Sequence, residues 1–201
     1  MTAAPTANPE REVIFTGIGG QGIQLMAKVL AEAAVAEGRH VMLFGSYQGM
    51  MRGGPSESTV VIADSEIQAP PIVPHCWALV AMHPEGLDVF VRKLRPDGLL
   101  FTNETLIKTP PPLHVRSIAV PVTRLAEHAG NVAGASMIAL GAFVAATELV
   151  SFDAVVGAMQ RALPPHRRQR AEENVRLLFL GAEHIRGHGR ANAAGAAPGA
   201  A

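Results

Sequence analysis

Two glycine-rich stretches hold the residues whose types and spacing could do chemistry. Residues 17–22 read Gly-Ile-Gly-Gly-Gln-Gly, and residues 45–55 read GSYQGMMRGGP. Glycine lets the backbone approach a ligand closely or turn with a positive φ. The guanidinium of Arg52 offers a planar fork of donors that suits a phosphate or a carboxylate. The second stretch is therefore either part of a ligand site or a structural loop whose tyrosine and methionines anchor the chain or fill an interface.

The first stretch matches G-x-G-x-x-G, directly after a predicted strand and at the opening of a predicted helix. This context is the one that the dinucleotide fingerprint requires, with backbone amides and a helix N-terminus aimed at phosphate. An acid about twenty positions later would hold a ribose hydroxyl, but the next strand ends Leu43-Phe44-Gly45-Ser46. The glycines therefore bind a phosphate or another ligand, or they permit close strand-to-helix packing, and the missing acid disfavours NAD.

The remaining candidate groups form no recognisable catalytic set. The histidines are scattered without ligand spacing: His40, His75, His83, His114, His128, His166, His184 and His188. Neither a nucleophile–base pair nor an H-E-x-x-H metal motif is present. The single cysteine, Cys76, can form no intrachain disulfide and no cysteine cluster for metal, so we expect a small buried hydrophobe.

Two further patterns have alternative interpretations. Arg167, Arg168 and Arg170 start the last predicted helix and either bind a phosphate or form a solvated face. Gly134 and Gly141 lie seven residues apart on one predicted helix. They allow close helix approach, within the core or at a subunit contact.

Composition indicates a globular protein of one domain. The chain has 201 residues, of which 48% are hydrophobic and 17% charged, and its 17 basic and 17 acidic side chains cancel. Nothing in this balance indicates a nucleic acid or an anionic membrane surface as a partner. Residues 132–146 are too few for a spanning helix and predict a buried one. The N-terminus lacks the pattern of a signal peptide, so a cytoplasmic location is expected.

Hydrophobic periodicity predicts strands alternating with helices, and then helices alone. The strands are expected at 13–16, 41–44, 58–63, 77–81, 98–102 and 115–120, and the helices at 23–34, 84–94, 122–129, 132–149, from the cap Ser151 onward, and 165–186. This order predicts an α/β, Rossmann-like fold, with a mainly parallel sheet, helices on both faces and a C-terminal helical extension. Residues 11–186 form one domain, and residues 1–10 and 187–201 are expected to be disordered. Both glycine-rich loops follow successive parallel strands, so their tips should meet at the carboxyl edge of the sheet.

These motifs, in this order, resemble a known family. The strand-GIGGQG-helix start, LMAKVLAEAAVAEG, SYQGMMRGGPSESTVVIA, GLLFTN, GNVAGASMIALGA and EENVRLLFLGAE together resemble the gamma subunit of 2-oxoacid:acceptor (ferredoxin) oxidoreductases. That family includes pyruvate, 2-oxoglutarate, 2-oxoisovalerate, indolepyruvate and phenylglyoxylate enzymes. The resemblance runs over about residues 12–186. Paired GGQG and RGGP signals at this spacing are more specific than either alone.

The resemblance implies one subunit of a complex that oxidatively decarboxylates a 2-oxoacid to an acyl-CoA and passes electrons to ferredoxin or a similar acceptor. Thiamine diphosphate, Mg and iron–sulfur clusters are expected on the alpha, beta and ferredoxin-like delta partners, with coenzyme A as co-substrate. The gamma region is associated with the coenzyme A side of the active site or with a subunit interface. Carried over by motif, this assigns to that site Gly17, Gly19, Gly20, Gln21 and Gly22 of the first loop, and Ser46, Tyr47, Arg52, Gly53 and Gly54 of the second.

The second loop departs from many relatives. They have a proline or glycine after the tyrosine and an acid before the arginine, where this chain has residues 48–51, Gln-Gly-Met-Met. Arg52 then pairs with a phosphate of coenzyme A or with a carboxylate of a partner. The alternative from another class is a stand-alone Rossmann-type nucleotide-binding or regulatory protein. A free NAD-dependent dehydrogenase would need an acid–base group and a ribose acid that the sequence does not present.

Overall fold

The structure is a computed structural model that describes residues 10–47, 54–68, 73–111, 115–163, 166 and 168–194, with the backbone alone at 46, 47, 168 and 188–194. The strands are β1 (Arg11–Ile18), β2 (His40–Tyr47), β3 (Pro55–Ala63), β4 (Cys76–Ala81), β5 (Leu94–Asn103) and β6 (Arg116–Val120). The helices are α1 (Ile23–Ala36), α2 (Leu87–Val91), α3 (Val122–His128), the 3₁₀ turn η1 (Val132–Gly134), α4 (Ala135–Thr147), α5 (Phe152–Ala162) and α6 (Arg168–Ala194).

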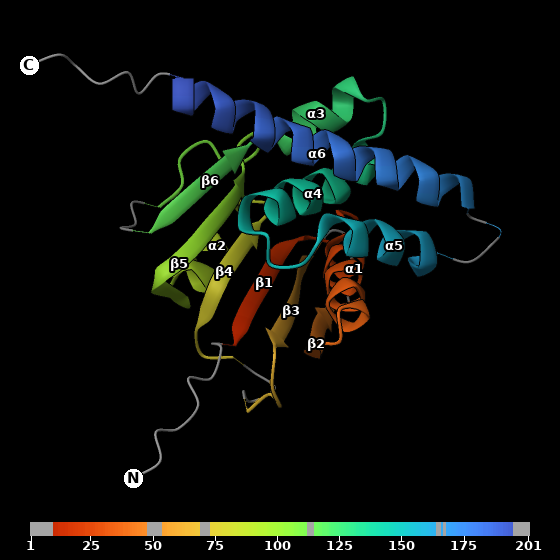
Figure 1. Cartoon of the computed structure of the whole chain (residues 1–201). Helices are drawn as coiled ribbons and strands as arrows, with labels where there is room; N and C mark the ends of the chain where they lie inside the picture. Colours follow the sequence, from red (N-terminus) through yellow and green to blue (C-terminus); the bar gives the residue numbers. More distant parts are fainter. Residues whose placement is uncertain are drawn as a thin grey trace, which may run out of the picture.

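The strands form one sheet in the order β2-β3-β1-β4-β5-β6 (Figure 1). Strands β1, β4, β5 and β6 are parallel neighbours, whereas β3 runs antiparallel between β2 and β1. The predicted α/β class and mainly parallel sheet are confirmed. The expectation that β1 and β2 are successive parallel strands of the sheet needs correction, because they point the same way but β3 separates them.

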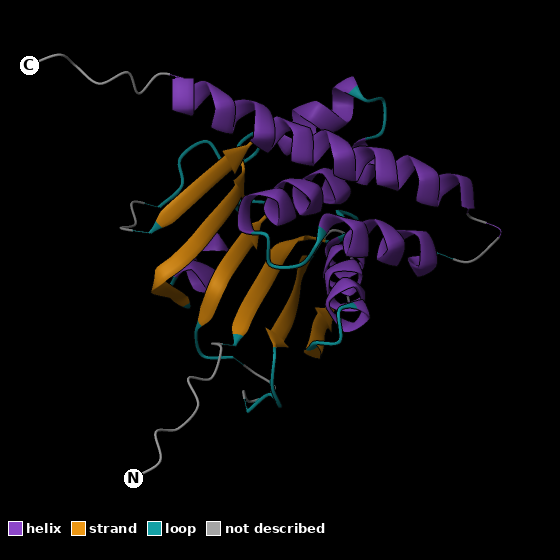
Figure 2. Cartoon of the chain, in the orientation of Figure 1, coloured by secondary structure: helices purple, strands orange, loops and turns teal. Residues whose placement is uncertain are grey.

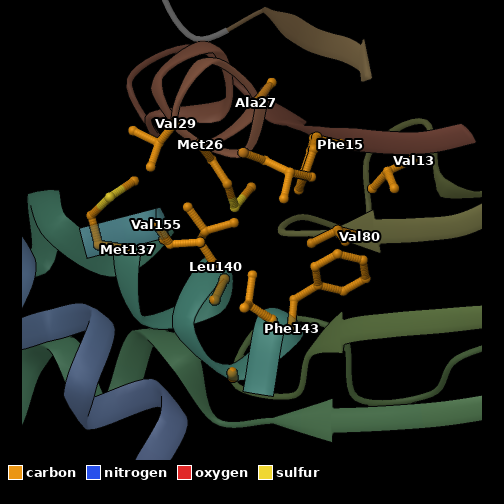
Figure 3. Close-up of a cluster of buried hydrophobic side chains, with 14 of the residues drawn as sticks. Val13, Phe15, Met26, Ala27, Val29, Val80, Met137, Leu140, Phe143 and Val155 are labelled. Atoms are coloured by element: carbon orange, nitrogen blue, oxygen red, sulfur yellow. The ribbon is translucent and has the colours of Figure 1, made fainter. Parts of the chain in front are cut away.

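The two faces of the sheet are covered unequally. Most helices gather on one face, and the short α2 lies on the other (Figure 2). Phe143 of α4 is central to the first face, with its ring 6.3 Å from Phe15, 6.3 Å from Phe101 and 6.4 Å from Trp77 in edge-on contacts. Figure 3 shows the buried side chains around Phe15 and Phe143, where residues of α1 and α4 pack together with residues of the sheet. On the second face, Leu87 of α2 joins a smaller buried cluster.

The long helix α6 crosses α4 at very short range. A Cβ added to Gly141 would meet the carbonyl oxygen of Leu178, and one added to Gly181 would lie 2.8 Å from the carbonyl carbon of Ile138. The backbones therefore touch with no side chain between them. Gly134 likewise leaves room for Leu177 of α6. The close approach predicted for Gly134 and Gly141 is confirmed, and it occurs within the core of this chain.

The main differences from the predicted boundaries concern α2 and α6. Residues 84–94 were expected to be helical, but α2 has five residues and Leu94 already pairs with Cys76 as the start of β5. The last helix was expected to end at 186, and α6 continues to Ala194 through part of the stretch expected to be disordered. Alanine has the highest helix propensity, which favours that extension. The predicted cap is confirmed, since Ser151 Oγ accepts from the amide of Ala154 at 3.2 Å. No helix of the described ranges is long and apolar enough to cross a membrane.

A carboxylate is buried on β1, in its second residue. Glu12 is 5% exposed, and its Oε1 accepts a hydrogen bond from Arg95 Nη2. Its Oε2 has no hydrogen-bond partner among the described residues. Burial raises the pKa of Glu12 above the ordinary 4.5, against the lowering effects of a backbone hydrogen bond and of Arg95. The fold therefore favours the protonated carboxyl.

The contact between α4 and α6 predicts opposite effects of two glycine substitutions on α6. Gly181→Ala should lower the free energy of unfolding by about 1–3 kcal/mol, because the new methyl group meets the α4 backbone. Gly187→Ala is the matched control, since its Cβ meets nothing within 4 Å, and it should stabilise by up to about 1 kcal/mol through helix propensity. Urea unfolding measures both values. Equal effects of the two substitutions would contradict the close contact.

Glu12→Gln should remove one pH dependence of stability. Because the pKa is raised in the folded state, the folded protein binds more protons than the unfolded chain between pH 4.5 and the raised pKa. The stability contributed by Glu12 is thus full below pH 4.5 and is lost as the pH rises through the folded pKa. Urea unfolding from this pH to neutrality should show the wild type losing stability relative to the variant. If the wild type instead gained stability relative to Glu12→Gln as the pH rises, the ion pair with Arg95 would stabilise the Glu12 carboxylate by more than its burial destabilises it.

Candidate functional site

The first glycine-rich stretch forms the turn between β1 and α1. Gly20 and Gly22 have φ angles of 96° and 75°, and Gly22 is the N-cap of α1. Glycine adopts such angles without strain. Gln21 closes the turn: the amide of Ile18 donates to Gln21 Oε1 at 3.0 Å, and the amide of Gln21 donates to the Ile18 carbonyl at 3.2 Å. The side-chain oxygen of Gln21 therefore holds the loop in shape.

Gly17 is required for packing at the end of β1. A Cβ added there would lie within 3.2 Å of three side chains, those of Gln21, Ile23 and Met82. At Gly20, by contrast, a Cβ would meet nothing within 4 Å. The loop is therefore crowded at its base, at Gly17, and open at its tip, at Gly20. The packing interpretation holds for Gly17, and the tip is free to meet a ligand or a partner.

The second glycine-rich stretch is joined to the first by a backbone hydrogen bond. The amide of Gly19 donates to the carbonyl of Gly54 at 2.8 Å. Ser46 and Tyr47 end β2 and pair with Glu57 and Ser56 of β3. The predicted meeting of the two loops at one edge is confirmed for their described ends. It arises because β2 and β3 form a hairpin that returns beside β1. Arg52 and Gly53 lie outside the described residues, so their contacts stay predictions.

A cavity of about 790 Å³ opens beside the first loop. Two helix starts converge there, because Gly22 caps α1 and Ser136 lies in the first turn of α4. A Cβ on Gly22 would lie 2.5 Å from Ser136 Oγ, so glycine permits this approach. Asn131 Oδ1 accepts from the amide of Gly134 at 3.1 Å and fixes the turn before α4.

Helix α6 forms the opposite wall of this cavity and contributes most of its charge. Arg170, Glu173, Asn174 and Arg176 line it together with Leu177. Arg170 and Arg176 bring two positive charges, and Glu173 one negative charge, to a cavity that the starts of α1 and α4 also line. Arg170 is exposed and lines this cavity, so a phosphate contact by Arg170 stays a prediction. Arg167 and the side chain of Arg168 lie outside the described residues.

The other singled-out groups form no second centre. Cys76 is fully buried, and burial raises the pKa of its thiol to about 12, so it is an inert core residue as predicted. Within the part of the chain that the structure describes, no group of three His, Cys, Asp or Glu residues could hold a metal ion.

Sequence reasoning missed the side chains that face the glycine loop across the cavity. Asn131, Ser136, Asn174 and Arg176 were not singled out, although the G-N-x-x-G-x-S run before α4 was quoted. The usable signal was an asparagine that caps the short turn η1, which leads into a helix rich in small residues. Such caps mark a helix start, which is a ready anion site when another charged element lies opposite.

A glycine-rich loop thus joins the first strand to the first helix of a mostly parallel sheet, an arrangement that is typical of α/β enzymes and their subunits. Residues 12–184 match the family described as pyruvate ferredoxin/flavodoxin oxidoreductase. The gamma subunit of a keto/oxoacid ferredoxin oxidoreductase from Geobacter sulfurreducens has a similar structure, with 30% sequence identity and a TM-score of 0.74. The match covers 87% of this chain and 98% of that one.

Two sequence relatives have different lengths. The 2-oxoglutarate synthase subunit KorC of Methanothermobacter marburgensis is 32% identical over 87% of this chain and 96% of its own length. The ketoisovalerate oxidoreductase subunit VorA of Methanothermobacter thermautotrophicus is 33% identical over 68% of this chain, but the match spans 28% of VorA. The chain belongs to the pyruvate ferredoxin/flavodoxin oxidoreductase family, as its gamma-subunit type of domain.

NAD should bind the full chain weakly or not at all, despite the G-x-G-x-x-G motif. The second strand ends at Gly45, Ser46 and Tyr47 and supplies no acid for a ribose hydroxyl. Titration calorimetry with NAD tests this expectation. Micromolar affinity that is lost in Gly19→Val would restore the dehydrogenase alternative.

Proposed function

We propose that this chain is the gamma subunit of a multi-subunit 2-oxoacid:acceptor oxidoreductase. The complex decarboxylates a 2-oxoacid with thiamine diphosphate, transfers the acyl group to coenzyme A, and passes the electrons to ferredoxin or a similar acceptor. Family membership over residues 12–184 supports this function. A relative of nearly the same length, KorC, is named as a subunit of 2-oxoglutarate synthase.

The cavity beside the glycine loop is the observation that carries the coenzyme A part of this proposal. Its walls combine Arg170 and Arg176 with the start of α1 at Gly22, and also with apolar Leu25 and Leu180. Coenzyme A combines phosphates with a long, mostly neutral arm, so a site for it needs donors at one end and apolar surface along the rest. The described ends of the two glycine-rich loops meet at the same edge of the sheet, where the amide of Gly19 donates to the carbonyl of Gly54.

The other cofactors of the reaction are assigned to partner subunits. The chain contains one cysteine, and that thiol is buried in the core, so cysteine-held iron–sulfur clusters belong to other chains. The sequence also lacks the G-D-G…N pattern for magnesium and thiamine diphosphate. We propose that these groups lie on the alpha, beta and ferredoxin-like delta subunits. This chain contacts those subunits through the edge of the sheet that carries the two glycine-rich loops.

Purification through a tag on this chain, from its own organism, tests the function. Alpha, beta and delta subunits should co-purify, and the complex should reduce an acceptor when given a 2-oxoacid and coenzyme A. The isolated chain should fold, hold neither iron nor thiamine diphosphate, and show no turnover. Purification of the chain alone, with tight binding of a nucleotide, would favour the stand-alone binding protein instead.

In the same assay, Arg170→Ala and Arg52→Ala should each raise KM for coenzyme A by about ten- to a hundredfold, because a charge-assisted hydrogen bond is worth roughly 1.5–3 kcal/mol. Arg52→Lys should recover part of that loss, since an ammonium cannot reproduce the bidentate fork. Arg161→Ala is the matched control, because Arg161 lines a separate groove beside α1 and β2. If either alanine variant left the kinetics unchanged but greatly lowered the melting temperature, that arginine would serve in a structural ion pair instead.

A further inference from the structure

A histidine follows β4 at the point where the connections of the sheet reverse. From β1 the chain passes through α1 toward β2 and β3, and from β4 it passes through α2 to β5 on the other side. Ligands of such sheets bind outside the carboxyl ends of the strands at this switch point. His83 stands there, two residues beyond Ala81, which pairs with Thr16.

The backbone before His83 is held rigidly against the glycine loop. The amide of Met82 donates to the carbonyl of Thr16 at 2.8 Å. Its carbonyl accepts from Asn103 Nδ2 at 3.2 Å, and Asn103 is fully buried and also donates to Thr123 Oγ1 at 2.8 Å. Met82 Cβ would lie 3.2 Å from a Cβ on Gly17. A side chain on the next residue is therefore positioned by the fold rather than by a free loop.

The ring of His83 presents one defined donor. Its Nδ1 accepts from the amide of Glu85 at 3.2 Å, so the neutral ring carries its proton on Nε2. Nε2 has no hydrogen-bond partner among the described residues, and the side chain is half-buried. His40 is exposed and lies at the start of β2, away from the carboxyl ends of the strands.

We propose that His83 is a positioning residue whose Nε2–H donates to an oxyanion of the bound substrate, either a carboxylate or a phosphate oxygen. This inference rests on the proposed function, which supplies two such groups, the carboxylate of the 2-oxoacid and the phosphates of coenzyme A. A donor fixed beside the glycine loop orients the substrate without taking part in bond making.

Steady-state kinetics of the purified complex separate the two sources. His83→Ala should raise one KM by about tenfold, that for the 2-oxoacid if the oxyanion is its carboxylate and that for coenzyme A if it is a phosphate. His83→Gln should restore most of the loss, because the glutamine amide nitrogen reaches about the position of Nε2. His40→Ala is the matched control and should leave both constants unchanged. Two unchanged KM values in His83→Ala, an equal loss in His83→Gln, or loss of the partner subunits would overturn the proposal.

A second measurement on the full chain keeps this inference separate from the proposed function. Nitrogen NMR of histidine-labelled protein should show His83 as the Nε2–H tautomer, and added inorganic phosphate or acetate should shift its Nε2 signal but not that of His40. If the complex lacks 2-oxoacid activity, the proposed function fails while this titration still tests His83. An Nδ1–H tautomer, or no shift with either anion, would overturn the assignment.

Discussion

The direct backbone contact between α4 and α6 is the constraint on which the candidate site depends. At Gly141 and Gly181 no side chain separates the two helices, so α6 is held against α4, whose start lines the same cavity as the start of α1. Arg170 and Arg176 then line the same cavity as Gly22. A bulkier residue at either glycine would lift α6 and widen the gap between guanidinium groups and glycine loop. The charged wall of the cavity is thus positioned by small residues that touch no ligand.

Most elements could be predicted because each has a clear period, and the errors have physical causes. The strands expected at 41–44 and 58–63 left residues 45–57 between them, which is long enough for the crossover of about a dozen residues that a parallel neighbour needs. In the structure β2 runs to Tyr47 and β3 starts at Pro55, so only residues 48–54 connect them, and the two strands form a hairpin. Helix α2 was overestimated because an apolar stripe through Leu94 fits a helix as well as the start of a buried strand.

The candidate site was predictable where it is local in sequence and was missed where it is not. The glycines of the first loop are recognisable because their spacing follows a strand directly. Residues Arg170, Asn174 and Leu177 lie at helical spacing on one face of α6, yet nothing local tells which element that face meets. Ser136 is more than one hundred positions from Gly22, and only the fold brings the two within contact. Long-range packing of small residues leaves no periodic signal of its own.

The first glycine loop differs between its base, at Gly17 and Gly22, and its tip, at Gly20. Its base is rigid, because Gly17 packs against Met82 and Gly22 packs against Ser136. These two contacts tie the loop to the segment that carries His83 and to the cavity lined by α6. Its tip is open: Gly20 needs glycine for its φ of 96° but is exposed, with no atom near its Cβ position. Gly38 and Gly130 combine positive φ angles with the same open surroundings, so this geometry marks an exposed tight turn. Most backbone amides of the loop are already used, since those of Ile18, Gly19 and Gln21 donate to Gln21 Oε1 and to the carbonyls of Gly54 and Ile18. The loop therefore enters the proposed contact with another subunit in a fixed shape, and a preorganised surface binds without an ordering cost.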